Sequence, residues 1–354
     1  MTVRPTAPWS ETTTMRRALI LGANGQIGRA TALSLHRDGW DVDLADRGGR
    51  ALPPELVALG LRRHVVDRSS DADLDEALAD GVDLLVDIVA YTAEDGDQLV
   101  ARADRIGHLV AISSVSVYAD ETGAAFDGED TFPQLPVPIL ESQPTVAPGP
   151  STYSTRKVAL ERALLQQDRL PVTVLRPGAI HGPGQRHARE WWVVKRALDG
   201  RCRLPLAHPD GRFHTTSVAN LAELIRLAGS EPGHRVLNAC DPKALSAAEI
   251  VAAVVAAGGW DLQVCAISGP PPAGVGDSPW SVPADVVVDM SAARDQLGYR
   301  ALVDYPQAVI DTVRWLVQDV GPRPDWQVVL SGLAGYGAAF MDYAAEDAYL
   351  ASVN

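Results

Sequence analysis

The sequence predicts an α/β protein with a doubly wound parallel sheet and a smaller C-terminal lobe. From residue 15 onward, short apolar runs alternate with longer amphipathic stretches, as strands and covering helices do in such a fold. A glycine-rich turn directly follows the first apolar run. The chain of 354 residues is also longer than one ordinary core requires, so an additional lobe is expected.

Six apolar runs are the expected strands, and ligands of such sheets bind beyond the carboxyl ends of the strands. In chain order they are RALIL (17–21), DVDLAD (41–46), RRHVVD (62–67), VDLLVDIV (82–89), HLVAISS (108–114) and PVTVLR (171–176). Helical patterns lie between them, at 29–39, 73–80 and 157–168. The stretch 119–150 is rich in Pro and acidic residues and too irregular for either element, which leaves a substrate lid or a surface insertion as alternatives.

The composition excludes several classes of partner. The formal net charge of −14 argues against general binding to nucleic-acid backbones, which clustered Lys and Arg drive. No apolar run reaches the roughly 18 residues that span a bilayer, so no membrane partner is expected. The three cysteines, Cys202, Cys240 and Cys265, are too far apart to indicate a disulfide framework or a metal site. A reducing cytoplasm is therefore the expected location.

Three glycines follow the first expected strand in LGANGQIG. Gly22, Gly25 and Gly28 form a G-x-x-G-x-x-G pattern between a strand and a helix, which is the context of a pyrophosphate site. Glycine lets the backbone turn and approach the phosphates, and the helix N-terminus supplies free N–H groups and a positive dipole end. The alternative is tight packing of strand against helix. The pattern predicts a dinucleotide-binding domain over residues 15–180, a flexible tail over 1–14, and a mainly substrate-binding lobe, interwoven with the first domain, over 181–354.

Polar residues after the next strands extend this site. Asp46 lies about twenty residues beyond the glycines, where an acid binds a ribose diol and repels a 2′-phosphate. Arg47 follows it and is suited to bind that 2′-phosphate, so NAD is favoured and NADP stays open. Asp67 is placed to accept from the adenine amino group or to cap the following helix. We expect Val89, Ala90 and Tyr91, after the fourth strand, to pass beneath the cofactor.

A Tyr–Lys pair supplies the expected acid/base chemistry. Tyr153 and Lys157 are four residues apart on an expected helix and therefore share a face. An ammonium beside a phenol favours the phenolate and lowers the pKa of the tyrosine, which makes it a usable acid/base near neutral pH. Ser114, at the end of the fifth strand, is placed to hydrogen-bond the same substrate oxygen.

These motifs together resemble a known family. GANGQIG, ISSVSVY, YSTRK and LRPGAIHGPG are similar to the extended short-chain dehydrogenase/reductases, specifically the NAD-dependent epimerase/dehydratase group, over roughly residues 16–320. The resemblance implies a Rossmann fold, Tyr153 as the catalytic acid/base, Lys157 on the nicotinamide ribose, and Ser114 as the family serine. The complete set of expected cofactor residues is Gly22, Asn24, Gly25, Gln26, Ile27, Gly28, Asp46, Arg47, Asp67, Arg68, Val89, Ala90, Tyr91, Ser113, Tyr153, Lys157, Pro177 and Ile180.

The expected function is hydride transfer at a secondary hydroxyl or ketone of a sugar or nucleotide-sugar-like substrate. Epimerisation and simple oxidation or reduction both stay open. Family members that eliminate water carry an Asp–Glu pair where this chain has Val115 and Ser116, so dehydration is not expected unless a carboxylate such as Glu141 enters from the long stretch. Arg212 matches the family's substrate-phosphate contact approximately. A homodimer is left open, and the alternative class is a non-catalytic dinucleotide sensor or RNA-associated protein on the same fold.

Side chains after the sixth strand, in HGPGQRHAREWW, could serve the substrate. Arg186 and Arg189 are suited to pair with a phosphate. Because Trp191 and Trp192 are adjacent, at most one of them is expected to face the site and the other to be core. His181 and His187 are expected to be ordinary surface histidines.

Overall fold

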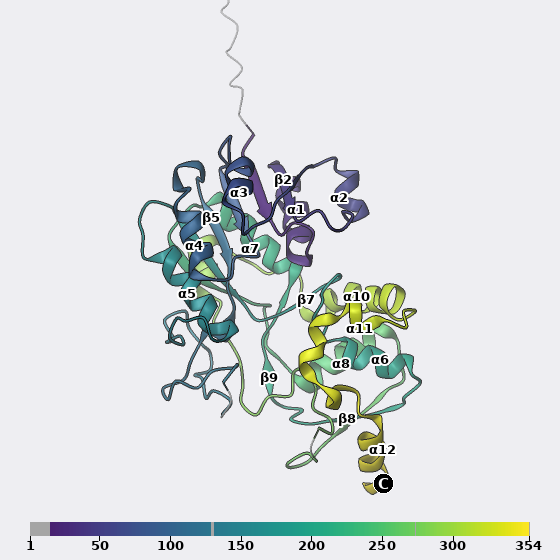
Figure 1. Cartoon of the computed structure of the whole chain (residues 1–354). Coiled ribbons are helices and arrows are strands. Elements are labelled where there is room, and N and C mark those ends of the chain that lie inside the picture. Colours follow the sequence, from purple (N-terminus) through teal and green to yellow (C-terminus); the bar gives the residue numbers. More distant parts are fainter. Residues whose placement is uncertain (1–14, 129–130, 273, 354) are drawn as a thin grey trace, which may run out of the picture.

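The computed structural model describes residues 15–128, 131–272 and 274–353, so the expected tail over 1–14 lies outside it. Within the described residues, seven parallel strands form the large sheet in the order β11-β6-β5-β4-β1-β2-β3 (Figure 1). The strands are β1 (Arg17–Leu21), β2 (Asp41–Asp46), β3 (Arg62–Val65), β4 (Leu84–Asp87), β5 (Leu109–Ile112), β6 (Val172–Pro177) and β11 (Arg235–Ala239). The chain starts at β1, runs to one edge and then returns across the sheet, which confirms the doubly wound fold.

The sheet has a seventh strand, β11 at its edge, which was not among the six expected strands. Its sequence RVLNA has an Arg and an Asn among its five residues, so it lacks the continuous apolar run of a buried parallel strand. Leu237 pairs with Leu175 of β6, and the chain thus returns from the C-terminal half to the first sheet.

Helices cover both faces of the sheet. Ile20 and Val86 face a core that contains Leu35 of α1 and Ile225 of α7, whereas Leu19 and Leu85 face a second core that contains Leu99 of α4. Since successive side chains of a strand point to opposite faces, both cores follow from the apolar strand sequences. The helices of this part are α1 (Gln26–Arg37), α2 (Pro54–Ala58), α3 (Asp71–Ala77), α4 (Ala93–Val100), α5 (Tyr153–Leu165), α7 (Val218–Ser230) and α9 (Ser291–Leu297).

A smaller lobe follows from the later segments (Figure 1). Its core contains Trp191 and Trp192, both buried, and it extends the chain beyond the sheet. Its helices are α6 (Trp191–Leu198), α8 (Ala247–Gly258), α10 (Tyr305–Trp315), α11 (Trp326–Val329) and α12 (Tyr343–Ser352). Three short strand pairs complete this half: β7 (Ala179–His181) with β10 (Thr215–Ser217), β8 (Arg203–Leu206) with β13 (Gln263–Ala266), and β9 (Arg212–Phe213) with β12 (Leu245–Ser246).

The stretch 119–150 runs over the molecule as an irregular insertion. Its backbone is held at several points: Val146 donates to the carbonyl of Val117 at 2.9 Å, and Ile139 donates to that of Val287 at 2.7 Å. The Ile139 side chain is fully buried. These contacts fit a packed surface insertion, the second of the two alternatives.

The C-terminal helix α12 packs on the smaller lobe. Glu346 of α12 forms a buried ion pair with Arg196 of α6, and Tyr343 donates to Asp199 at 2.7 Å. A buried guanidinium is stable when a carboxylate compensates it, so this end of the chain is part of the lobe.

Candidate active site

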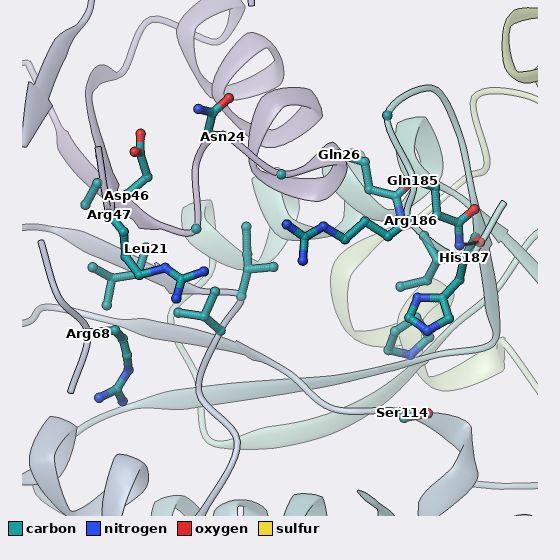
Figure 2. A pocket seen from close by; sticks show the side chains of 18 of the residues that line it. Leu21, Asn24, Gln26, Asp46, Arg47, Arg68, Ser114, Gln185, Arg186 and His187 are labelled. Carbon is teal, nitrogen blue, oxygen red and sulfur yellow. Dashed lines mark hydrogen bonds between the residues drawn. The ribbon is translucent and has the colours of Figure 1, made fainter. Parts of the chain in front are cut away.

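A cavity of about 1560 Å³ opens at the carboxyl edge of the large sheet (Figure 2). Its walls come from the turn after β1, from the ends of β2 to β6, and from the loop after β7. The expected site residues that line it are Gly22, Asn24, Gly25, Gln26, Asp46, Arg47, Asp67, Arg68, Val89, Ser113, Ser114, Tyr153, Pro177 and Ile180. The expected residues Ile27, Gly28, Ala90, Tyr91 and Lys157 lie behind this lining.

The glycine turn has the backbone that its sequence predicted. Gly22 takes φ +88°, which favours glycine, and a Cβ on Gly28 would lie 2.5 Å from the Gly22 carbonyl oxygen. Helix α1 begins at Gln26, and its N-cap Gly25 makes no side-chain capping bond. The first N–H groups of α1 are therefore available to an anion at the cavity wall. This cradle fits the diphosphate of a dinucleotide.

The Asp46 carboxylate, at the end of β2, already has partners within the protein. Its carboxylate accepts from Arg63 at 2.6 and 2.9 Å and from the Gly48 N–H at 2.7 Å. Arg63, on β3, was not among the expected site residues, and one strand position on its own could not indicate this cross-strand pair. The negative charge that was expected to repel a 2′-phosphate is compensated within the protein.

Asp67 and Arg68 follow β3, and their side chains differ in how many protein partners they already have. The Asp67 carboxylate accepts from the Ser69 N–H and hydroxyl, which lowers the pKa of Asp67, and Ser70 rather than Asp67 caps α3. Arg68 lines the cavity, but its guanidinium donates to Asp87 at 2.8 Å, to Gln98 and to the Asp95 carbonyl. All three guanidinium nitrogens therefore have protein partners, while the role of Arg68 toward a cofactor stays a prediction.

The segment after β4 forms the cavity floor. The Asp87 carboxylate accepts from the N–H groups of Val89 and Ala90, at 2.9 and 2.8 Å, and so fixes the turn. Val89 is 46% exposed in the cavity, whereas Ala90 is buried. The Tyr91 ring lies 5.6 Å from the Tyr153 ring, centroid to centroid, and supports it from behind.

Ser114, Tyr153 and Lys157 come together at one end of the cavity. Tyr153 is the first residue of α5 and is 45% exposed, while Lys157 lies one turn later and is 5% exposed. The Lys157 Nζ donates to the carbonyls of Ala90 and Ile112, each at 2.8 Å, and lies 5.9 Å from the centroid of the Tyr153 ring. Ser114 and Tyr153 both line the cavity.

The electrostatics of this group differ in one respect from the expectation. Burial raises the pKa of Tyr153, and the hydrogen bond with Ser114 only partly opposes this. The net direction is therefore the opposite of the expected lowering, while the Lys157 ammonium, 5.9 Å from the ring centroid, donates to the Ala90 and Ile112 carbonyls. Burial also lowers the pKa of Lys157 to about 8, against the opposing effect of Asp87, Asp95 and Glu161.

A buried ion pair stands behind the catalytic group, and sequence reasoning missed it. Glu161, two turns after Tyr153 on α5, forms an ion pair with Arg176 of β6 and accepts a hydrogen bond from the Ser113 hydroxyl. Both charged side chains are about 5% exposed. The i, i+4, i+8 spacing of Tyr153, Lys157 and Glu161 on one helix face was the available signal.

The segment after β6 agrees with most expectations and corrects one of them. Trp191 and Trp192 are both core residues, and His181 is buried and bonds to Asp241 at 3.0 Å, because β7 pairs with β10. His181 is therefore not a surface histidine. Arg186, His187 and Arg189 line the cavity.

Arg212 does not line the cavity. It begins β9, which pairs with β12 across the smaller lobe, and its charge acts on Glu249 instead. The approximate match to a substrate-phosphate contact is corrected on this geometry. Among the residues that the structure describes, no cluster of His, Cys, Asp or Glu could hold a metal ion, and no helix is long and apolar enough to cross a membrane.

Comparison with known proteins identifies the family. The sequence profile of the "NAD dependent epimerase/dehydratase family" matches residues 18–238, more than half of the chain. The chain belongs to this family of NAD-dependent enzymes. Membership confirms the family that the motifs predicted, and NAD is the family's cofactor.

Individual relatives are more distant. The chain is 29% identical to a 3-diazoavenalumate denitrifying reductase of a Streptomyces species, over 60% of this chain and 70% of that protein. It is 46% identical over 48 residues to UDP-N-acetylmuramoylalanine–D-glutamate ligase of Synechococcus elongatus, but spans about a tenth of that ligase's length (10%).

Solved structures share the fold. WbmG of Bordetella bronchiseptica, solved with NAD, has a TM-score of 0.65 at 20% identity, covering 88% of this chain and 97% of that one. UDP-N-acetylglucosamine 4-epimerase of Bacillus cereus has a TM-score of 0.64 at 18% identity, covering 86% and 99%. These similarities confirm the Rossmann-type sheet.

Proposed function

We propose that the chain is an NAD(P)-dependent oxidoreductase or epimerase that acts on a secondary hydroxyl or ketone of a sugar or nucleotide-sugar-like substrate. The observation that carries the proposal is that one cavity is lined by the glycine cradle and by Ser114 and Tyr153, with Lys157 buried behind this lining. A dinucleotide on the cradle would extend along the strand ends toward Tyr153. The family and the nucleotide-sugar enzymes with this fold support the substrate class.

The protein's own residues handle the proton and the oxygen charge. Tyr153 gives its phenolic proton to a substrate carbonyl oxygen, or takes the proton of a hydroxyl in the reverse direction. Ser114 donates a hydrogen bond to the same oxygen, and the Lys157 ammonium stabilises negative charge on Tyr153. A bound nicotinamide supplies or accepts the hydride. The Tyr91 ring, tilted by 39° against that of Tyr153, limits the positions that the phenol can take.

The described residues at the positions expected for dehydration chemistry are not placed to perform it. Val115 is buried and cannot exchange a proton, and the Ser116 hydroxyl accepts from Ser154 at 3.1 Å. Glu141 does not enter the cavity, since its carboxylate accepts from the Asn238 N–H at 2.8 Å and burial raises its pKa. We therefore propose chemistry at a single carbon.

Two versions of that chemistry remain, and a specific observation supports each. The family and the 4-epimerase fold relative favour epimerisation, whereas the 29%-identical relative is a reductase. Incubation with candidate nucleotide sugars in heavy water, followed by product mass and reduced-nicotinamide absorbance, separates them. Steady consumption of reduced cofactor selects the reductase, and interconversion of stereoisomers without it selects the epimerase. Loss of water from the product would contradict both.

We propose that the adenosine end accepts NADP as well as NAD, because Arg63 compensates Asp46 while Arg47 and Arg50 line the cavity. Arg63→Met would leave the Asp46 carboxylate unpaired, so we expect NADP to bind about tenfold more weakly while NAD binding is unchanged. Arg62→Met is the matched control, since Arg62 pairs with Asp43. Calorimetric titration of each cofactor measures the ratio, and an unaltered NADP/NAD ratio in Arg63→Met would refute the assignment.

We expect ketone reduction to slow as the pH rises through about 8. Below this value Lys157 is protonated and can stabilise the tyrosinate that forms when Tyr153 gives up its proton, and above it the charge is lost. Lys157→Arg keeps a positive charge at all these values, so its profile should lack the inflection. The profile of kcat/KM between about pH 6 and 10 tests this. The same inflection in both proteins would rule out Lys157 as its source.

The non-catalytic alternative would need the cavity to bind a dinucleotide without turnover. The intact Ser114, Tyr153 and Lys157 group argues against it, because a sensor has no use for a phenol placed beside a buried ammonium. The three cysteines, Cys202, Cys240 and Cys265, are free thiols. The cytoplasm and a homodimer both stay predictions.

A further inference from the structure

Arg186 reaches into the cavity from the loop that follows β7. Figure 2 shows its guanidinium directed into the cavity, toward Arg47 on the opposite side and away from His187. Within the described part of the chain, this guanidinium has no hydrogen-bond or ion-pair partner. An exposed arginine without a partner is ordinary on a surface, but here it lines the wall of the cavity that also holds the glycine turn.

The acids of the cavity do not compensate it. Asp46 is paired with Arg63, and Asp95 accepts from the N–H groups of Tyr91 and Thr92 at 2.7 and 2.9 Å. Asp67 interacts with Arg47, whose charge contributes to lowering the pKa of Asp67. Two guanidinium groups therefore point toward one another across the cavity of a chain whose formal net charge is −14. An anion bound between them would be attracted to both guanidinium groups.

The cavity wall opposite Arg186 indicates where the anion would bind. The glycine turn with the free N–H groups of α1 lies on the same stretch of cavity as Arg47, with Asn24 and Gln26 beside it (Figure 2). We propose that Arg186 closes over the diphosphate of the dinucleotide, on the side opposite the glycine turn. The inference rests on the proposed function and assigns one further binding residue to it. Guanidinium groups suit this role because two N–H donors can bind one phosphate.

The C-terminal segment holds the Arg186 loop in place. The Gly332 N–H donates to the Arg186 carbonyl at 3.1 Å, and a Cβ on Gly332 would lie 2.4 Å from the His187 ring. Arg189 donates to the Tyr336 hydroxyl at 3.1 Å. Residues 331–336 therefore fix the loop from outside, which gives the otherwise unassigned end of the chain a positioning role.

Binding of ADP and adenosine to the full chain tests the proposal without any turnover. We expect Arg186→Gln to weaken ADP by roughly tenfold or more and to leave adenosine unchanged, because only ADP carries the diphosphate. Arg169→Gln is the matched control, since Arg169 is exposed and does not line the cavity. Arg186→Lys should recover part of the loss, because it restores the charge without the paired donors.

The other outcomes overturn the proposal in distinct ways. Unchanged ADP binding with weakened binding of UDP-glucose would assign Arg186 to the substrate's diphosphate, and equal loss for ADP and adenosine would indicate a general disturbance of the cavity.

Tyr336→Phe removes one hydrogen bond to the loop, and we expect ADP to bind about threefold more weakly. Unaltered ADP binding by Tyr336→Phe would remove the positioning role. Since ADP binding requires no catalysis, failure of the proposed chemistry would not affect these results.

Discussion

Replacing Tyr153 by Phe should reduce kcat by a factor on the order of 10² or more while cofactor affinity stays nearly unchanged. The phenol oxygen is the only part removed, and it is the atom that exchanges the proton with the substrate. The ring keeps its contact with Tyr91 at 5.6 Å between centroids, so the fold at the start of α5 is expected to persist. Steady-state kinetics with a calorimetric cofactor titration measure both quantities.

Tyr91→Phe is the matched control for this experiment. Tyr91 lies against Tyr153 and also near the Lys157 ammonium, at 5.6 Å from Nζ to its ring centroid, but it does not line the cavity. Removing its hydroxyl should change kcat by less than about threefold. Retained turnover in Tyr153→Phe, or an equal loss in both variants, would remove Tyr153 from the mechanism.

Glu161→Gln should lower the free energy of unfolding by about 3–5 kcal/mol. The substitution keeps the shape of the side chain but leaves the Arg176 guanidinium buried without a compensating charge. The hydrogen bond from Ser113 to this side chain loses its charged acceptor as well. Denaturant unfolding measures the change in stability through the transition midpoint.

A second variant and a control decide the cause of that loss. In Glu161→Gln combined with Arg176→Met, the unpaired charge is gone, and we expect part of the stability to return. Glu223→Gln breaks a more exposed ion pair with Arg226 on α7 and should cost less than about 1 kcal/mol. The single variant Arg176→Met is measured as well. If the double variant loses as much free energy of unfolding as the two single variants lose together, the ion pair is not the source of the loss.

The parts of the fold that the sequence predicted are those with strong local patterns. Five of the six apolar runs became parallel strands that are largely buried, whereas β3 at the sheet edge is partly exposed. The glycine turn was recognisable because Gly28 must approach the Gly22 carbonyl. Strand β11 was missed because its polar residues mask the pattern. Its place is decided by pairing with β6, about 60 residues earlier, which no local pattern reveals.

In the candidate site too, local sequence patterns predicted some residues, and the others depend on tertiary contacts. Ser114, Tyr153 and Lys157 were predictable because their spacing and their positions at element ends imply proximity. The pairing of Asp46 with Arg63 and the approach of Arg186 depend on which side chains meet across strands and loops. Burial also reversed the expected pKa shift of Tyr153, and burial is a property of the packed molecule.

The account's central claim is that this cavity brings a nicotinamide and Tyr153 to the same substrate carbon and oxygen. The most direct test mixes the full chain with reduced dinucleotide deuterated at the transferable position and a panel of keto nucleotide sugars, and follows the product by mass spectrometry. We predict that the wild-type protein transfers deuterium to the substrate carbon, as both an epimerase and a reductase would, and that Tyr153→Phe transfers it at least 10²-fold more slowly. A protein that binds the dinucleotide tightly but transfers no deuterium to any of these ketones would contradict the claim and favour a non-catalytic dinucleotide sensor.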